Sequence, residues 1–469
     1  MRGFFPGLLL FGLALGAIAQ NRIGTGEVRT LYRENCMSCH GEHLRGGGGA
    51  IGGSLLVDRW EKIPDGRDFI DYVKYGNPDM GMPAYGDALS DAQIRALEIY
   101  IDEEAQKAER QGAVVRPEAG GIYRAGGYAF RLETVAEGLE IPWSLVFLPG
   151  GGALITERGG ALRLFKEGRL RAPVEGTPEV WARGQGGLLE VGIHPNYREN
   201  AWIYLGFSES SAGSGNRGRG MTKIVRGRVI DNQWLDEEVI FEVPDRFHNG
   251  SGVHFGTRFV FQDGYLFFSI GDRGRQDQAQ DLSVPNGKIH RIFQDGRIPP
   301  DNPFVGRSGA YPSIWSYGNR NAQGLAAHPE TGELWESEHG PRGGDEINRI
   351  EGGRNYGWPV ITHGMNYDGT PITERTAAPG MEQPKLHWTP SIAVCGMDFY
   401  RGERFPEWKY DLFVGGLASN ELHRRVSEDG EVVRDEIILD DAGRVRDVEN
   451  GPDGHLYLVL NGPGRIARL

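Results

Sequence analysis

The clearest chemical motif in the chain is a run of two cysteines and a histidine, Cys36-Met37-Ser38-Cys39-His40. At this spacing both thiols can form thioether bonds to haem c while the histidine binds the iron. A structural zinc site needs four ligands, and the only other cysteine, Cys395, lies far along the chain. A thioredoxin-like dithiol would accompany a βαβ pattern, whereas this motif follows a short amphipathic segment, residues 27–35. Cys36, Cys39 and His40 are therefore predicted to hold haem c.

A methionine is the expected second ligand of the iron. Met80 and Met82 both follow the haem motif, and we assign Met82, directly before Pro83, with Met80 as the alternative. A thioether opposite a histidine raises the reduction potential, which suits an electron acceptor. Ser90 to Gln93 is typical of a capping box and predicts a helix that runs to about residue 104. Residues 20–104 thus form the predicted haem domain, which resembles a class I cytochrome c.

The first residues have the features of an export signal. Arg2 precedes an apolar run over residues 8–18, and Ala17-Ile18-Ala19 has the small-x-small form of a cleavage site. The run is short for a bilayer span, although an uncleaved anchor is the alternative. We expect residues 1–19 to be a cleaved signal peptide and the product to be periplasmic, with no transmembrane segment in the mature chain.

Length and composition favour two domains and limit the partners. The chain has 469 residues and a formal net charge of −13, which argues against nucleic acid or anionic lipid as a partner. It also has 72 glycines and 10 tryptophans, which favour a β-rich main body with many turns.

That main body contains a loose repeat of strand, tight turn and strand. The six copies are residues 144–157, 188–207, 258–270, 325–337, 397–414 and 448–460. We predict a mainly β fold, a six-bladed propeller over residues 128–469, preceded by a linker over residues 105–127 without a strand pattern. A β-sandwich is the alternative, and six similar units favour the propeller.

Three loops between these strands carry groups that could bind a ligand. Residues 318–324 combine a cation with amides between glycines, and residues 338–348 offer the carboxylate and carbonyl oxygens that calcium prefers. Arg444 and Arg446 alternate along an extended segment, so they are expected to share one face. Two such guanidinium groups could clamp a multiply anionic ligand.

Five motifs together identify a family resemblance. They are Val253 to Arg258, Arg320-Asn321-x-Gln323-Gly324, Glu338 to Asn348, Asn355 to Pro359, and Arg444-x-Arg446-Asp447. In this order they resemble the soluble quinoprotein glucose/sorbosone dehydrogenase family, and most of all its aldose sugar dehydrogenase members. The resemblance covers nearly all of residues 128–469.

The resemblance implies a propeller that holds pyrroloquinoline quinone (PQQ) on calcium near its axis. It implies PQQ-binding positions at Gln185, Arg320, Asn321, Tyr367, Ala418, Arg444 and Arg446. The carbonyl groups of Gly340 and Pro341 match ligands of the catalytic calcium. Glu346 and the carbonyl of Tyr356 match a second, structural calcium site.

The resemblance also implies a catalytic base, His254. Four residues separate it from Arg258, which favours it over nearby His248. A neutral imidazole can accept a hydroxyl proton near physiological pH. Two positions depart from the family: Ala418 replaces a lysine that contacts the quinone, and Val253 replaces an often polar neighbour of the base.

The expected function is periplasmic oxidation of the anomeric carbon of aldoses to lactones. Electrons would pass from PQQ to the haem of the same chain and on to a soluble cytochrome or another respiratory component. Two alternatives remain open: oxidation of a non-sugar alcohol or a larger glycan, and a non-enzymatic binding propeller with a redox-sensing haem.

Overall fold

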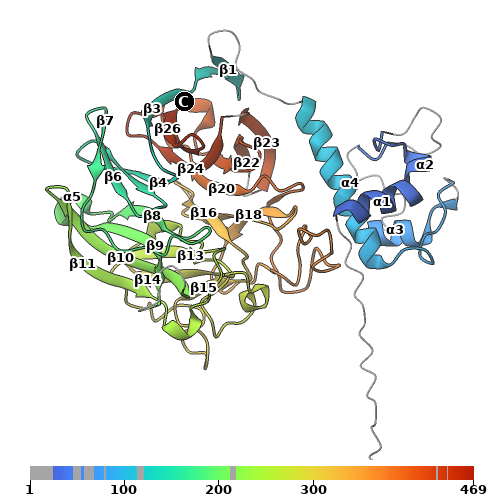
Figure 1. Cartoon of the computed structure of the whole chain (residues 1–469), viewed down its shortest axis with the longest axis horizontal. Helices are drawn as coiled ribbons and strands as arrows, with labels where there is room; N and C mark the ends of the chain where they lie inside the picture. Colours follow the sequence, from blue (N-terminus) through green and yellow to red (C-terminus); the bar gives the residue numbers. More distant parts are fainter. Residues whose placement is uncertain are drawn as a thin grey trace, which may run out of the picture.

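The computed structural model describes residues 25–45, 54–56, 68–78, 81–112, 121–211, 218–428, 431–440 and 442–469. A small helical domain precedes a ring of β-sheets (Figure 1). The expected signal peptide and Met80 lie outside the described residues. Among the helices within these ranges, none is both long and apolar enough to cross a membrane.

The helical domain is built from α1 (Thr25–Asn35), α2 (Met37–His40), α3 (Phe69–Tyr75) and α4 (Asp91–Gly112). Its apolar core includes Val28 of α1 and Leu97 of α4, which are both inaccessible to solvent or nearly so. The predicted capping box starts α4, because the Ser90 N–H donates to Gln93 Oε1 at 2.9 Å and the Gln93 N–H to Ser90 Oγ at 3.3 Å. The helix continues to Gly112 rather than ending near residue 104.

Six four-stranded antiparallel sheets within the described ranges form the propeller, as predicted. Each predicted repeat supplies the first two strands of one blade. Blade 1 is β4 (Pro142–Phe147), β5 (Ala153–Glu157), β6 (Leu162–Lys166) and β7 (Arg169–Pro173); blade 2 is β8 (Leu188–Ile193), β9 (Ile203–Ser210), β10 (Gly220–Ile230) and β11 (Gln233–Glu242); blade 3 is β12 (Phe259–Gln262), β13 (Tyr265–Ile270), β14 (Lys288–Phe293) and β15 (Ile314–Tyr317). Blade 4 is β16 (Ala322–Ala327), β17 (Leu334–Glu338), β18 (Asp345–Ile350) and β19 (Leu386–Trp388); blade 5 is β20 (Val394–Phe399), β21 (Leu412–Gly416), β22 (Leu422–Glu428) and β23 (Glu431–Leu439).

Blade 6 joins the two ends of the propeller sequence. It consists of β24 (Arg444–Asn450), β25 (Leu456–Asn461), β26 (Arg465–Arg468) and β3 (Glu133–Glu137), which comes from the start of the domain. The last two strands pair antiparallel, with Ile466 opposite Ala136. The sheet therefore closes the ring through backbone hydrogen bonds between its first and last strands.

A hairpin occupies part of the segment expected to be a linker. Strands β1 (Ile122–Ala125) and β2 (Tyr128–Arg131) pair with each other, so strand structure begins before residue 128. Tyr128 and Phe130 pack edge-to-face on Trp408 with ring centroids 5.2 and 5.8 Å apart, and the Trp408 indole N–H donates to the carbonyl of Gly126 at 2.7 Å. Aromatic packing, invisible in the local pattern, thus fixes this segment against blade 5.

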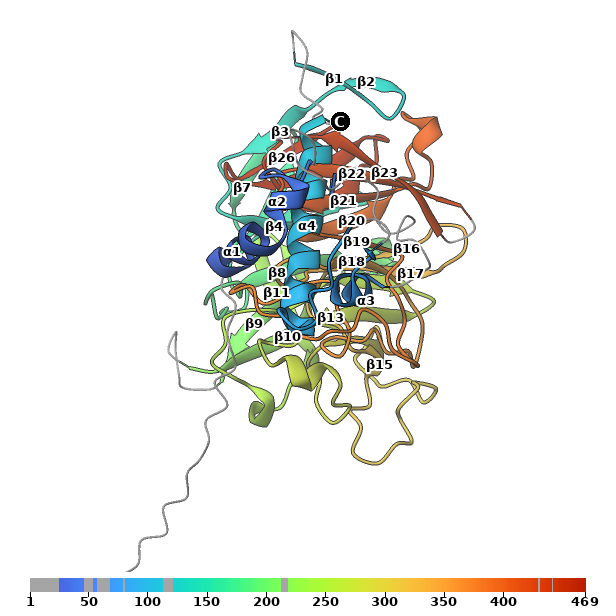
Figure 2. The ribbon, with the colours of Figure 1, turned by 90° about the vertical axis from the view of Figure 1, so that its right-hand side faces the viewer.

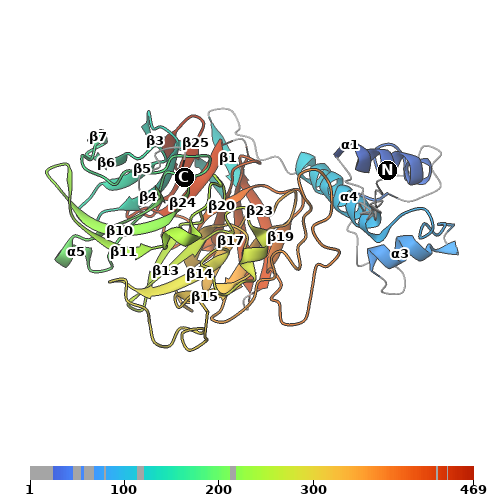
Figure 3. The same cartoon turned by 60° about the horizontal axis from the view of Figure 1, so that its bottom comes forward.

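The helical domain lies beside the ring, with α4 on the side nearest the propeller (Figures 1 and 3). Seen from that side, α4 runs across the sheets (Figure 2). The short helix α5 (Tyr197–Asn200) and the 3₁₀ turns η4 (Asp245–Phe247), η5 (Gln276–Ala279) and η6 (Pro406–Trp408) lie in propeller connections.

Candidate active site

His254, the predicted base, lies in the connection before β12 and is held by two hydrogen bonds. Its backbone is in the left-handed region with φ of 56°, a conformation that non-glycine residues adopt mainly where the surroundings enforce it. The His254 N–H donates to Gln185 Oε1 at 2.8 Å, and Nδ1 lies 2.6 Å from Asp272 Oδ1. Because a carboxylate only accepts, we assign the proton to Nδ1, which leaves the Nε2 lone pair to accept a proton.

Asp272 follows β13 and is itself held in place. Its Oδ2 accepts from the Trp358 indole at 2.9 Å and its Oδ1 from the Gly274 N–H at 2.8 Å. Burial lowers the pKa of His254 and Arg320 adds to this effect, while Asp272 opposes it. The imidazole is therefore neutral near pH 7, as a base must be.

His248, the other histidine considered for this role, is placed differently. It is 5% exposed, its Nε2 contacts the carbonyl of Val243 at 2.9 Å, and its Nδ1 contacts Ser211 Oγ at 3.1 Å. With both ring nitrogens engaged by the protein, this imidazole has no nitrogen left for a substrate. The geometry therefore favours His254.

Three predicted cofactor arginines converge on His339. Burial lowers the pKa of His339 well below its usual value, and the charges of Arg446, Arg320 and Arg444, together with His254, lower it further. These groups come from the start of blade 4, from blade 6 and from the connection into blade 3. The fold thus brings residues that are far apart in the sequence together around His339.

The guanidinium groups here bond to neutral partners. Arg320 Nη1 donates to the carbonyls of His339 and Gly340 at 2.9 and 2.8 Å. Arg446 Nη1 donates to Gln323 Oε1 at 2.9 Å, and Arg444 Nη1 to the carbonyl of Leu417 at 3.0 Å.

Within the described ranges no carboxylate forms an ion pair with Arg320, Arg444 or Arg446. The buried atoms Arg446 Nε and His339 Nε2 also have no hydrogen-bond partner in this part of the protein. Three guanidinium groups without a direct carboxylate contact, together with two unsatisfied polar atoms, fit a ligand with several carboxylates, such as PQQ.

The remaining predicted PQQ positions differ in exposure. Asn321 is buried, and its Oδ1 accepts from the Gly256 N–H at 3.2 Å. Gln185 and Ala418 are exposed, and Tyr367 is 70% exposed. The Ala418 N–H is bonded to the carbonyl of Ile392 at 2.9 Å, so only its methyl group is available to a ligand at this position.

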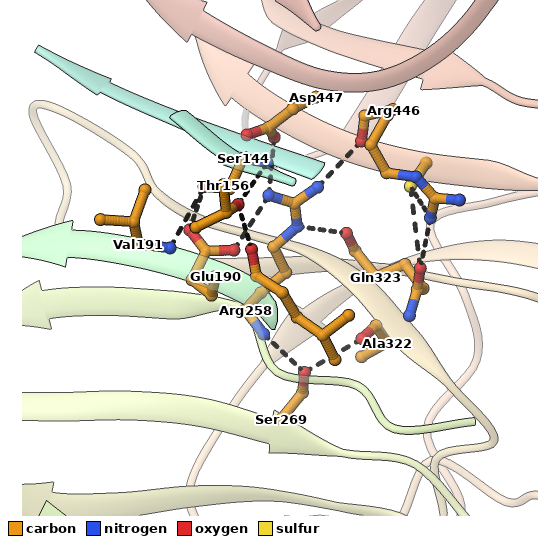
Figure 4. Close-up of polar contacts among 12 residues, drawn as sticks. Ser144, Thr156, Glu190, Val191, Arg258, Ser269, Ala322, Gln323, Arg446 and Asp447 are labelled. Carbon is orange, nitrogen blue, oxygen red and sulfur yellow. Dashed lines mark hydrogen bonds and ion pairs between the residues drawn. The ribbon is translucent and has the colours of Figure 1, made fainter. Parts of the chain in front are cut away.

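Arg258 is buried and makes polar contacts with residues of several blades (Figure 4). It pairs with Glu190 at 3.0 Å and Asp447 at 2.8 Å, and donates to the carbonyls of Gln323 at 2.6 Å and Arg446 at 2.9 Å. One side chain of blade 3 thereby fixes blades 2, 4 and 6 at the axis. It holds the backbone of both members of the Gln323–Arg446 pair.

The predicted structural calcium site contains buried carboxylates. Glu336, Glu338 and Glu346 are at most 9% exposed. Burial raises the pKa of all three, that of Glu338 to about 7, and mutual repulsion raises those of Glu336 and Glu346 further. Glu336 Oε2 has no hydrogen-bond partner among the described residues. Buried acids that repel one another fit a cation in their midst.

A small cavity marks the place. It has a volume of about 10 Å³, which suits a single small ion, and its walls include Glu338, Glu346, Tyr356 and Gly340. Among the residues in the described ranges, no set of three His, Cys, Asp or Glu side chains is arranged as metal ligands. The ligands predicted here include backbone carbonyl groups, as oxygen-loving calcium allows.

The haem motif forms a single turn, with the Cys39 and His40 N–H groups donating to the carbonyl of Cys36 at 3.1 and 2.9 Å. Both cysteines are free and partly buried. Cys36 and Met82 pack against the same apolar cluster. Met82 is fixed by two backbone hydrogen bonds to Asn77, each 2.9 Å long. These groups fit haem c, with the thiols on one side and a thioether at the same core.

Some functional residues were not assigned from the sequence. Asp272 follows a predicted strand within Gly271-Asp272-Arg273-Gly274, a position typical of site carboxylates, and this signal could have identified it. His339 lies within residues 338–348, which were considered only as a source of oxygen ligands for calcium. Cys395, expected to be a buried apolar residue, is buried and accepts from Arg446 Nη1 at 3.4 Å.

Comparisons with known proteins match both parts of the chain. The family model of glucose/sorbosone dehydrogenases matches residues 139–468, and that of the cytochrome c oxidase cbb3-type subunit III matches residues 25–101. The chain is 44% identical over 338 residues to aldose sugar dehydrogenase YliI of Escherichia coli (strain K12), covering 70% of this chain and 90% of that protein. It is 30% identical over 273 residues to quinoprotein glucose dehydrogenase B of Acinetobacter calcoaceticus, covering 53% and 56%.

Solved structures agree with these matches. A crystal structure of a glucose dehydrogenase superposes with a TM-score of 0.69 at 43% identity, covering 72% of this chain and 99% of that one. The PQQ-bound aldose sugar dehydrogenase of Streptomyces coelicolor superposes with a TM-score of 0.57 at 28% identity, covering 71% and 95%.

Proposed function

The chain belongs to the glucose/sorbosone dehydrogenase family and carries a cytochrome c domain before the propeller, and we propose that it oxidises the anomeric hydroxyl group of aldoses to lactones. PQQ on calcium would serve as the immediate oxidant and haem c of the same chain as the next acceptor. We place this activity in the periplasm, with a soluble cytochrome or another respiratory component downstream.

One observation carries the proposal: the His254–Asp272 pair lies beside the cluster of Arg320, Arg444 and Arg446 around His339. A proton acceptor next to a cluster of cations that can bind an anionic cofactor is what a quinone-dependent dehydrogenase requires. A propeller that only binds a ligand would use the arginines but would not need the proton acceptor beside them.

The chain's own residues have distinct tasks. His254 Nε2 accepts the proton of the anomeric hydroxyl group, and Asp272 keeps the other ring nitrogen protonated so that Nε2 faces the substrate. The arginines bind the carboxylates of the cofactor and fix its orientation. When bound, PQQ would supply a two-electron acceptor, and the carbonyls of Gly340 and Pro341 would hold a calcium ion that acts as a Lewis acid.

The decisive experiment adds an aldose to protein loaded with PQQ and calcium and follows the absorbance of the haem. We expect sugar-dependent haem reduction, which His254→Ala abolishes while leaving the haem spectrum of the oxidised protein unchanged. His248→Ala is the matched control, because it removes a nearby imidazole whose two ring nitrogens are both bonded to the protein, and this variant should reduce its haem normally.

A panel of sugars and simple alcohols defines the substrate. Activity on alcohols alone would replace the aldose assignment with the alternative of a non-sugar alcohol. Turnover retained in His254→Ala would mean that another group removes the proton.

A further inference from the structure

Helix α4 has two buried faces. One face, with Ile94, Leu97 and Ile101, belongs to the core of the haem domain. The other carries Arg95, Glu103 and Gln106, which are eight and three positions apart and so lie on one side of an α-helix. Each of these three residues bonds to the propeller. Helix α4 lies on the side of the helical domain that is nearest the propeller in Figures 1 and 3.

Glu103 makes the strongest of these contacts. Its Oε1 accepts from Arg342 Nε at 2.8 Å and its Oε2 from Arg342 Nη2 at 2.7 Å. The two side chains are only 5% and 20% exposed. A two-point contact between a planar guanidinium and a carboxylate fixes orientation as well as distance.

Two weaker contacts extend the interface along the helix. Gln106 Oε1 accepts from the Thr389 N–H at 3.2 Å, and Arg95 Nη2 donates to the carbonyl of Thr362 at 3.4 Å. His363, next to Thr362, stacks on His387 with ring centroids 3.7 Å apart. Burial keeps the pKa values of both imidazoles low and the Arg95 charge lowers them further, so near pH 7 both rings are neutral.

Arg342 connects this interface to the cofactor loop. It lies between β17 and β18, one residue after Pro341 and two after Gly340, whose carbonyls are the predicted calcium ligands. Gly340 is tied to Arg320 through its carbonyl and to Asp345 through its N–H at 2.8 Å. Arg342 itself exchanges two backbone hydrogen bonds of 3.0 Å with Met365. The haem domain therefore contacts a rigid loop of the site itself.

We propose that α4 docks the haem domain on this loop through the Glu103–Arg342 pair, and that the docked arrangement sets the rate at which electrons from the sugar reach the haem. This rests on the proposed function. Each aldose oxidised to a lactone releases two electrons and two protons, and ferric haem accepts one electron at a time. The haem must therefore be reoxidised by an external one-electron acceptor within each turnover.

The test uses the full-length holoprotein and reverses one charge of the pair. In Glu103→Arg two cations face each other at the interface, and we expect sugar-dependent haem reduction to slow by about tenfold or more. Sugar oxidation measured with a small artificial acceptor that takes electrons at the propeller should stay unchanged. The double variant Glu103→Arg/Arg342→Glu should recover much of the haem reduction, because it restores an ion pair in the opposite sense.

A matched control removes the neighbouring charge. Glu104→Gln alters a carboxylate that pairs with Lys107 of the same helix at 2.8 Å and takes no part in the interface contacts described above, so its rate of haem reduction should equal that of the unchanged protein. The rate of haem reduction in Glu103→Gln should lie between that of the unchanged protein and that of Glu103→Arg.

Small-angle X-ray scattering supplies a readout that needs neither PQQ nor sugar. Glu103→Arg should increase the radius of gyration relative to Glu104→Gln, because the domains separate. An unchanged radius would overturn the docking, and separated domains with unchanged haem reduction would overturn its control of the rate. If the unchanged protein did not oxidise sugar with the artificial acceptor, the proposed function would be contradicted. The scattering result would still decide whether the haem domain docks.

Discussion

Replacing Arg258 with methionine should destabilise the propeller severely. The substitution keeps much of the apolar stem but removes the guanidinium that pairs with Glu190 and Asp447, whose side chains are 8% and 5% exposed. Removing one partner of such a buried pair costs about 3–5 kcal/mol, because the remaining charges stay buried without compensation. The same change at Arg226, whose partner Glu238 is 50% exposed, should cost about 0.2–1 kcal/mol.

The loss in Arg258→Met should also depend on pH. Burial raises the pKa of Glu190 to about 8 even though Arg258 lowers it, so the variant's pKa should be higher still. A carboxyl group with a folded pKa above its unfolded value binds its proton more tightly when folded. The stability of both proteins should therefore fall as the pH rises from about 4.5 towards 8. Above that pH the loss continues in the variant, so its deficit relative to the unchanged protein should be smaller at pH 7 than at pH 9.

Guanidinium chloride titration followed by tryptophan fluorescence measures this, because the linear extrapolation gives the free energy of unfolding. Arg258→Met, Arg226→Met and the unchanged protein are compared at both pH values. If Arg258→Met lost no more than Arg226→Met, or lost the same amount at both pH values, the claim that Arg258 compensates buried charge would be refuted.

Four further results are expected. Asp272→Asn should lower kcat by about a hundredfold or more with little change in KM, because the imidazole loses the partner that fixes its tautomer; steady-state kinetics with an artificial acceptor measure this. The acid limb of kcat/KM in the unchanged protein should lie below pH 6.5, because burial lowers the pKa of His254, and a limb above that value would contradict the assignment. Chelation of calcium should lower the melting temperature and readdition should restore it, an effect that Glu346→Gln weakens; a melting temperature indifferent to calcium would exclude the site. Met82→Ala should lower the haem reduction potential, whereas Met80→Ala should not, and redox titration separates the two ligands.

The sequence predicted the inner half of each blade and missed the outer half for a physical reason. Strands such as β4 and β5 are apolar on both faces because they are enclosed by neighbouring blades. Strand β7, Arg169–Pro173, has only one side chain that is not exposed, so its residues carry no burial pattern. The extra length of α4 beyond residue 104 was missed similarly, since it includes Gln106, a polar residue whose partner comes from the propeller.

Site residues could be predicted where they lie in one sequence motif. They could not be predicted where the fold brings separate segments together. His254 follows from its motif, but its pairing with Asp272 joins two segments that meet only through the blade 3 backbone. The expected shared face of Arg444 and Arg446 is modified by a bulge between Val445 and Asp447. A bulge shifts the alternation of side chains, and these arginines accordingly bond to blades 5 and 4 respectively.

The closure of blade 6 imposes an order on biogenesis. Strand β3 leaves the ribosome before any other strand of the ring, yet its partner β26 is among the last residues made. Until the C-terminus arrives, β3 keeps an open edge, and non-local pairing of this kind is slow. The helical domain consists of local contacts and can take up its haem while the propeller is still incomplete. Truncating the last few residues should therefore impair assembly of the whole ring, because it removes the partner of β3. The haem spectrum of the helical domain should remain normal.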